Sequence, residues 1–112
     1  MKYKSYIQLI FTYGGNKVIV KKIIRYIKKL FGFYENGYEY YVNLHDIVIT
    51  AQFSESKPGF KKMEEKFNYY LKNDKLPAPI ILNHDFILID GYISYLICES
   101  YGIMKVPVQF AD

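Results

Sequence analysis

The stretch Pro79–Phe110, PIILNHDFILIDGYISYLICESYGIMKVPVQF, predicts how this chain folds. Its unbroken apolar run, Ile80–Leu82, is typical of a strand that is buried on both faces. Asn83–Asp85 reads as a turn, Phe86–Ile89 as the returning strand, and the residues after Asp90-Gly91 as a helix. Such a step from a buried strand to a helix is where α/β proteins most often bind an anion or a nucleotide phosphate. Asp90-Gly91 is therefore the predicted ligand site.

Two more elements complete this stretch. The helix is expected over about Tyr92–Tyr101, because Gly102 is a typical residue just beyond a helix end. Lys105–Phe110 reads as the closing strand. Because proline cannot donate a hydrogen bond to a neighbouring strand, Pro107 predicts that this strand lies at a sheet edge, or that the proline stands at its start.

The segment before this stretch predicts a hairpin. Asn36-Gly37 is a strong turn signal, with Phe33-Tyr34 before it and a strand over Tyr38–Asn43 after it. The chain is expected to continue extended over Leu44–Thr50.

A polar loop over Phe53–Gly59 is expected next. Ser56 and Pro58 are suited to the start of a helix, which should run to about Asn73. One face of this helix is apolar, with Phe60, Met63, Phe67 and Leu71.

The N-terminal part predicts a basic amphipathic helix. Lys2–Tyr13 suits a strand and a helix equally well, and Asn16 is a suitable N-cap for a helix over Lys17–Phe31. Apolar side chains fall on one side of this helix and basic ones on the other. The basic side consists of Lys17, Lys21, Lys22, Arg25, Lys28 and Lys29.

Charge is unevenly distributed along the chain. Residues 1–32 hold eight basic and no acidic side chains, which gives +8, and residues 33–112 hold seven basic and eleven acidic ones, which gives −4. The two parts add up to the net charge of +4. This asymmetry predicts a basic N-terminal extension, residues 1–37, on a domain of residues 38–112, together forming one compact unit.

Three interpretations of the basic helix face remain open. It is a solvated surface that keeps an apolar helix in solution, a contact for nucleic acid or another acidic partner, or a membrane-surface helix. Lysine in place of arginine argues against base reading, because the bidentate guanidinium fork is missing.

Composition limits the class of protein. At 112 residues, with 51% hydrophobic and 19% aromatic side chains, the chain can form one modest core and is not a disordered polymer. The single cysteine, Cys98, excludes an intramolecular disulfide and a cysteine-cluster metal site. No run approaches the roughly 18 apolar residues of a membrane span, and no leader pattern is present. We therefore expect a cytoplasmic protein.

From about Val42 onward the chain resembles the ParB/sulfiredoxin-like superfamily, which includes the N-terminal domain of chromosome-partitioning ParB proteins, sulfiredoxin and free serine kinases. The resemblance rests on an ordered set of pieces that covers about two thirds of the chain. These pieces are Val42–Ile47, Lys57–Asn73, Pro79–Leu82, Ile87–Gly91, Tyr95–Ile97, Gly102-Ile103 and Val106–Val108.

The resemblance implies an α+β fold in which helices pack on a small mixed sheet, here with a basic helical N-terminal extension. It also implies contacts to phosphates or a nucleotide after the Asp-Gly step. The family usually places His or Glu, then His or Arg, then Arg there, whereas this chain has Tyr92, Ile93 and Ser94. Sulfiredoxin has its nucleophilic cysteine where this chain has Tyr92. The resemblance therefore leaves enzymatic activity an open question.

The candidate phosphate-binding residues are Asp90, Gly91, Tyr92 and Ser94. Asp90 suits either a structural role in the turn or a role as a site carboxylate. The Ser94 hydroxyl could donate one hydrogen bond to a phosphate oxygen. The positive charge that the family places after the Asp-Gly step could instead come from lysines on the opposite rim of the site. The candidates are Lys57, Lys61 and Lys62.

No metal site is expected, since His84 and Asp85 read as turn residues. The candidate cofactor is a nucleotide with Mg²⁺.

These observations favour a small domain that binds nucleotide or nucleic acid with weak or no catalysis. One alternative is a phage- or plasmid-type protein-interaction or inhibitor module with a decayed active site. A second is a ParB-like nuclease or nucleotide hydrolase. A ParB protein would continue into a helix-turn-helix domain, whereas this sequence ends at Asp112, so full partition function is not expected.

Overall fold

The computed structural model describes residues 17–112, with side chains from residue 20 onward. The chain divides into two compact units, Met1–Glu35 and Asn36–Asp112. The element expected at Lys2–Tyr13 and the cap expected at Asn16 lie outside the described residues. The first unit contributes helix α2, Lys17–Leu30.

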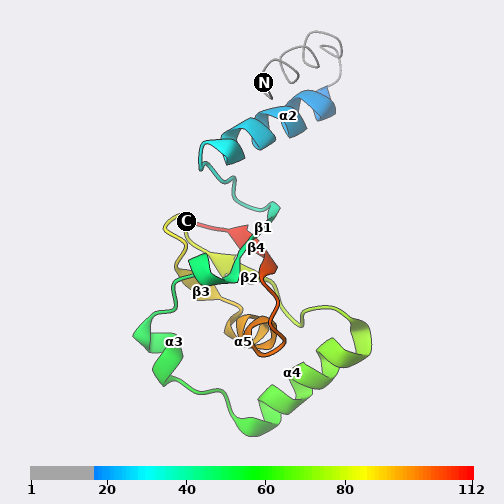
Figure 1. The fold of residues 1–112 in the computed structure, drawn as a ribbon, viewed down its shortest axis with the longest axis vertical. Coiled ribbons are helices and arrows are strands. Elements are labelled where there is room, and N and C mark those ends of the chain that lie inside the picture. The colour runs from blue at the N-terminus through cyan, green and yellow to red at the C-terminus, as the bar shows by residue number, and fades with distance from the viewer. Residues whose placement is uncertain (1–16) are drawn as a thin grey trace. The chain divides into compact units, whose positions relative to one another are not determined.

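The second unit is an α+β domain, as predicted (Figure 1). Helix α5 contacts strand β2, and helix α4 contacts α5. In chain order the elements are β1 (Glu39–Asn43), the 3₁₀ turn η1 (Leu44–Asp46), α3 (Ala51–Glu55), α4 (Phe60–Asn73), β2 (Ile80–Leu82), β3 (Leu88–Asp90), α5 (Tyr92–Ser100) and β4 (Lys105–Phe110).

The sheet is mixed, with strand order β1-β4-β2-β3. β4 pairs antiparallel with β1 and parallel with β2, and β2 pairs antiparallel with β3. The placement of Pro107 at an edge or strand start is wrong, because β4 is an inner strand and Pro107 pairs with Tyr41. The ladder to β2 begins at Val108, one residue beyond the proline, so the missing N–H interrupts no pairing with β2.

The core follows the alternation of the strands. β1 buries Tyr40 and Val42, and β4 buries every second residue from Val106 to Phe110. Ile80 and Leu82 of β2 are fully buried, whereas Ile81 on the opposite face is half-buried, so the expected burial is complete on one face only. Helix α5 adds Ile97 and Cys98 to this core.

The predicted hairpin around Asn36-Gly37 is wrong. Phe33-Tyr34 forms no strand, Asn36 bridges Phe110, and the Gly37 N–H donates to the Phe110 carbonyl. The partner of β1 is thus β4, which comes last in the chain. The Asn-Gly signal identified a turn, and Gly37 does have a φ of +80°, but such a signal does not specify the partner strand.

Two other local predictions are wrong. The extended segment at Leu44–Thr50 contains η1 and one isolated bridge, Val48 to Ile87. The loop expected to start at Phe53 begins inside α3, a helix that buries no residue and so has no apolar stripe to reveal it.

Helix α4 lies where the sequence predicts it, but its predicted apolar face is only partly right. Phe60 is 84% exposed and Leu71 is 63% exposed. Phe67, which was predicted, and Tyr70, which was not, have rings that contact Tyr101, the C-cap residue of α5.

Gly91 connects β3 to α5 under a strict steric constraint. Its φ of +85° lies in the left-handed region. A Cβ at this position would collide with the Pro79 carbonyl oxygen and lie 2.8 Å from Ile80 Cα. The start of α5 is therefore packed directly on the backbone that leads into β2.

We predict that Gly91→Ala lowers the free energy of unfolding by about 3 kcal/mol or more, because overpacking adds to the cost of positive φ. Gly37→Ala is the matched control, since Gly37 has nearly the same φ and a methyl group added there would have no neighbour within 4 Å. It should cost only about 1 kcal/mol. Urea unfolding of the two variants checks this, and equal losses would contradict the steric account.

Candidate functional site

The first turn of α5 begins at Gly91, which is its N-cap residue. The Tyr95 N–H donates to the Gly91 carbonyl and starts the helical hydrogen bonds. Asp90 is exposed and accepts the Gly91 N–H on Oδ1 at 2.8 Å. The carboxylate therefore holds the turn before the helix and does not cap it.

The Ser94 hydroxyl is used within the fold. Its Oγ donates to the Ala78 carbonyl at 2.6 Å and accepts the Ala78 N–H at 3.3 Å. The side chain is fully buried. In this structure the hydroxyl is thus committed to Ala78, whereas the sequence suggested a donor to a phosphate oxygen.

A groove of about 400 Å³ lies at the start of α5. Lys62 and Lys66, one turn apart on α4, both line it. The rings of Phe53 and Tyr92 also line it, with centroids 5.4 Å apart. The other lining residues are Ser56, Pro58, Pro77, Ala78, Asp90, Gly91, Ile93 and Ser94.

The structure thus brings the predicted Asp90, Gly91, Tyr92 and Ser94 together with one of the three proposed lysines, Lys62. Lys57 and Lys61 do not line the groove, and Lys66 was missed. The spacing of four residues from Lys62 is a signal that could have found Lys66, because such residues share a helix face.

This arrangement suits the binding of an anion. The first turn of a helix presents N–H groups without intrahelical partners and a partial positive charge. Two lysines on the same groove add full charges. Among the described residues, no three His, Cys, Asp or Glu side chains are grouped as a metal site would require.

Two side chains of α5 have raised pKa values. Burial raises the pKa of the Cys98 thiol. Burial, and then a hydrogen bond to Glu99, raises the pKa of Tyr95. Both groups are therefore protonated near neutral pH, and neither lines the groove at the start of α5.

A second groove, of about 650 Å³, lies beside β1 and β4. Tyr41, Tyr69 and Tyr70 line it, and it shares Pro77 and Ala78 with the first groove. The segment held by Ser94 therefore forms a wall common to both.

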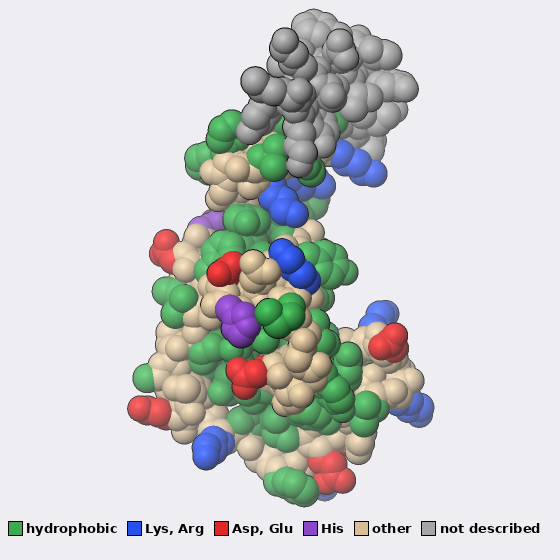
Figure 2. Space-filling model, in the orientation of Figure 1, with side chains coloured by type: hydrophobic (Ala, Val, Ile, Leu, Met, Phe, Trp, Pro, Cys, Tyr) green, Lys and Arg blue, Asp and Glu red, His purple; other side chains and the backbone are tan. Residues whose placement is uncertain are grey.

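The basic helix α2 belongs to the first unit, whereas both grooves are lined by residues of the second. Figure 2 shows Lys and Arg side chains beside hydrophobic ones on α2. Of the predicted basic contacts, Lys17 begins the helix, though its side chain is not among those described, and Arg25 is half-buried. The exposed ones are Lys21, Lys22, Lys28 and Lys29.

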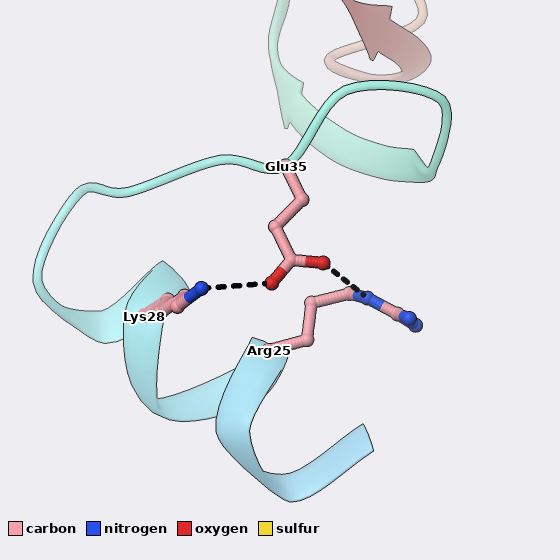
Figure 3. A network of polar contacts seen from close by, with 3 residues as sticks. All are labelled: Arg25, Lys28 and Glu35. Atoms are coloured by element: carbon pink, nitrogen blue, oxygen red, sulfur yellow. Dashed lines mark hydrogen bonds and ion pairs between the residues drawn. The ribbon is translucent and has the colours of Figure 1, made fainter. Parts of the chain in front are cut away.

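Arg25 and Lys28 share one carboxylate (Figure 3). Arg25 Nε lies 3.4 Å from Glu35 Oε2, and Lys28 Nζ lies 3.2 Å from Glu35 Oε1. The hydrogen bond from Lys28 is the main cause that lowers the pKa of Glu35. Two of the predicted basic contacts thus already have an acidic partner.

No protein-family model and no curated protein matches this chain in sequence. Among solved structures, two pNOB8-like ParB N-domains superpose with TM-scores of 0.56 and 0.52, at 21% and 25% identity over 67% and 65% of this chain. The C-terminally truncated chromosome-partitioning protein ParB from Caulobacter crescentus, solved with CTP-γ-S, superposes with a TM-score of 0.53 at 11% identity over 68% of this chain.

The fold is therefore ParB-like, which confirms the fold that the resemblance implied. The matched regions make up 30%, 26% and 45% of the three comparison chains. This chain thus corresponds to less than half of each.

We predict that Ser94→Ala lowers the free energy of unfolding by about 1–3 kcal/mol, because the Ala78 N–H and C=O lose their partner. Ser54→Ala is the control, since the exposed Ser54 hydroxyl makes only a 3.4 Å bond to Ala51, and it should change stability by no more than about 0.5 kcal/mol. Urea unfolding compares the two. A Ser94→Ala protein as stable as the wild type would show that this bond does not hold α5 in place.

Proposed function

We propose that this ParB-like domain binds a nucleotide by its phosphates in the groove at the start of α5, with little or no catalysis. The observation that carries the proposal is the placement of Lys62 and Lys66 on the same groove as the first turn of α5. The comparison structure of ParB from Caulobacter crescentus, solved with CTP-γ-S, supports the choice of a nucleotide.

Charge in the groove favours a polyphosphate of modest affinity. The helix start and each of the two lysines contribute about 0.3–1 kcal/mol to an anion contact. Lys62 and Lys66 supply positive charge that the Tyr92–Ser94 segment does not. We therefore expect dissociation constants in the range of roughly micromolar to millimolar.

The aromatic side of the groove provides a place for the base. Phe53 and Tyr92 lie next to each other and both line the groove. Stacking of a base on an aromatic ring contributes about 1–3 kcal/mol and tolerates any base. We propose that these rings contribute affinity while leaving little preference among nucleotides.

The carboxylate of Asp90 suits a Mg²⁺ ion that binds together with the nucleotide. Its exposed carboxylate lines the same groove and repels a bare phosphate. A Mg²⁺ ion usually binds through one or two carboxylates together with phosphate oxygens of the substrate. Asp90 and the phosphates would hold the ion jointly, so Asp90→Asn should improve nucleotide binding without Mg²⁺ and remove the benefit of adding it.

We also propose that the groove catalyses phosphoryl transfer weakly or not at all. Phosphoryl transfer relies on fixed charges placed around the reacting phosphate. In this groove the positive charges are two lysines on flexible stems, and the buried hydroxyl of Ser94 is hydrogen-bonded to Ala78. Turnover of CTP or ATP that disappears in Asp90→Ala would instead favour a nucleotide hydrolase.

Isothermal titration with CTP and ATP, each with and without Mg²⁺, tests the proposal. The Lys62→Gln/Lys66→Gln variant should bind about 3- to 30-fold more weakly, because it removes both lysine charges of the groove at about 0.3–1 kcal/mol each. Lys57→Gln/Lys61→Gln is the charge-matched control and should bind like the wild type, because neither residue lines the groove. No binding by the wild type, or an equal loss in both double variants, would refute the proposed site.

The protein-interaction alternative has one observation in its favour. The second groove is the larger of the two and carries Tyr41, 57% exposed, and Tyr69, 44% exposed. Tyrosine is enriched in protein interfaces. If neither nucleotides nor short DNA bind, this groove becomes the surface to test for a protein partner.

A further inference from the structure

We propose that helix α2 and the turn after it dock on the surface of an anionic lipid bilayer. The proposal rests on an apolar tip, formed by Leu30, Phe31 and Phe33, that lies next to a lysine-rich helix face. Within residues 17–112 no helix is long and apolar enough to cross a membrane.

The apolar tip is held by a hydrogen-bonded turn. The Gly32 N–H donates to the Lys29 carbonyl at 3.0 Å, and the Phe33 N–H donates to the Lys28 carbonyl at 2.8 Å. With Gly32 at a φ of +82°, these two bonds form a Schellman motif at the end of α2. The turn fixes the backbone from which the apolar side chains project.

The apolar tip is exposed although its side chains are large. Leu30 is 42% exposed, Phe31 is 63% exposed and Phe33 is 66% exposed. Side chains of this kind, when flanked by lysines, insert at the boundary between lipid headgroups and acyl chains. Lys29 belongs to the same turn and supplies a flanking charge.

The charge of α2 matches an anionic surface. The helix contains six basic residues and no acidic one. The first acidic residue after it, Glu35, is paired with Arg25 and Lys28 (Figure 3). Its lowered pKa keeps it ionised, and the two cations neutralise it. The exposed Lys21, Lys22 and Lys29 remain as cations for lipid phosphates.

Two features favour lipid over nucleic acid. Arg25 is the only arginine of the chain and its Nε is engaged by Glu35, so the helix offers mainly lysine point charges. A nucleic-acid backbone would use those charges but would leave Leu30 and Phe33 exposed to water. A bilayer interface uses both the charges and the apolar side chains.

Co-sedimentation of the full chain with large vesicles tests the proposal. Vesicles of phosphatidylcholine with about one third phosphatidylglycerol should pellet the protein, and pure phosphatidylcholine should not, because each lysine near the surface contributes about fivefold to partitioning. Lys22→Gln/Lys29→Gln should therefore weaken binding about 25-fold. Phe33→Ser should weaken it about tenfold or more, because it removes an inserted side chain.

Two variants are matched controls. Leu71→Ser removes a similarly exposed apolar side chain, 63% exposed, from α4, and Lys72→Gln/Lys105→Gln removes two exposed lysines outside α2. Both should bind vesicles like the wild type. Because all substituted side chains are exposed, circular dichroism should show the same fold for every variant.

The proposal fails if anionic vesicles do not pellet the protein, or if neutral vesicles pellet it equally well. It also fails if Phe33→Ser binds like the wild type, because the contact would then be charge alone. A DNA duplex serves as the competing probe. Lysine-dependent binding of DNA without binding of anionic vesicles would assign α2 to nucleic acid and overturn the lipid proposal.

Discussion

The close packing of the Gly91 backbone on the backbone of Pro79 and Ile80 is the constraint on which the rest of the site depends. Only a residue without a Cβ lets β3 turn into α5 at this point, and Ser94 then ties the first turn of α5 to Ala78. These contacts hold the N-terminus of α5 at the groove. The groove is therefore a product of backbone packing, which can persist when the side chains that would carry out chemistry are replaced.

How much of the fold was predictable depended on how local the signals were. Ile80–Leu82, the turn at Asn83–Asp85 and helix α5 carry strong patterns within a few residues, and the structure confirms them. The pairing of β4 with β1 and β2 joins segments far apart in the chain. For this reason Pro107 wrongly predicted an edge position or a strand start, and Asn36-Gly37 wrongly predicted a hairpin. Local propensity does not encode which strand becomes the partner.

The candidate site shows the same limit. The Asp90-Gly91 step is recognisable because a strand and a helix meet there, whatever the surrounding structure. The bond between Ser94 and Ala78 and the presence of Lys66 in the groove depend on how α5 and α4 pack, and local pattern alone does not establish them. The basic character of α2 was visible in the sequence, whereas the pairing of Arg25 and Lys28 with Glu35 required the structure.

We propose that the packing at Gly91 maintains a groove at the start of α5 that binds phosphate. Backbone-amide NMR of the full chain, titrated with CTP in the presence of Mg²⁺, measures this directly. The account predicts saturable shifts for the amides of Tyr92, Ile93 and Ser94 and for those of Lys62 and Lys66, which line the groove. Saturable shifts confined to the second groove around Tyr41 and Tyr69, or no shift in the first turn of α5, would contradict it.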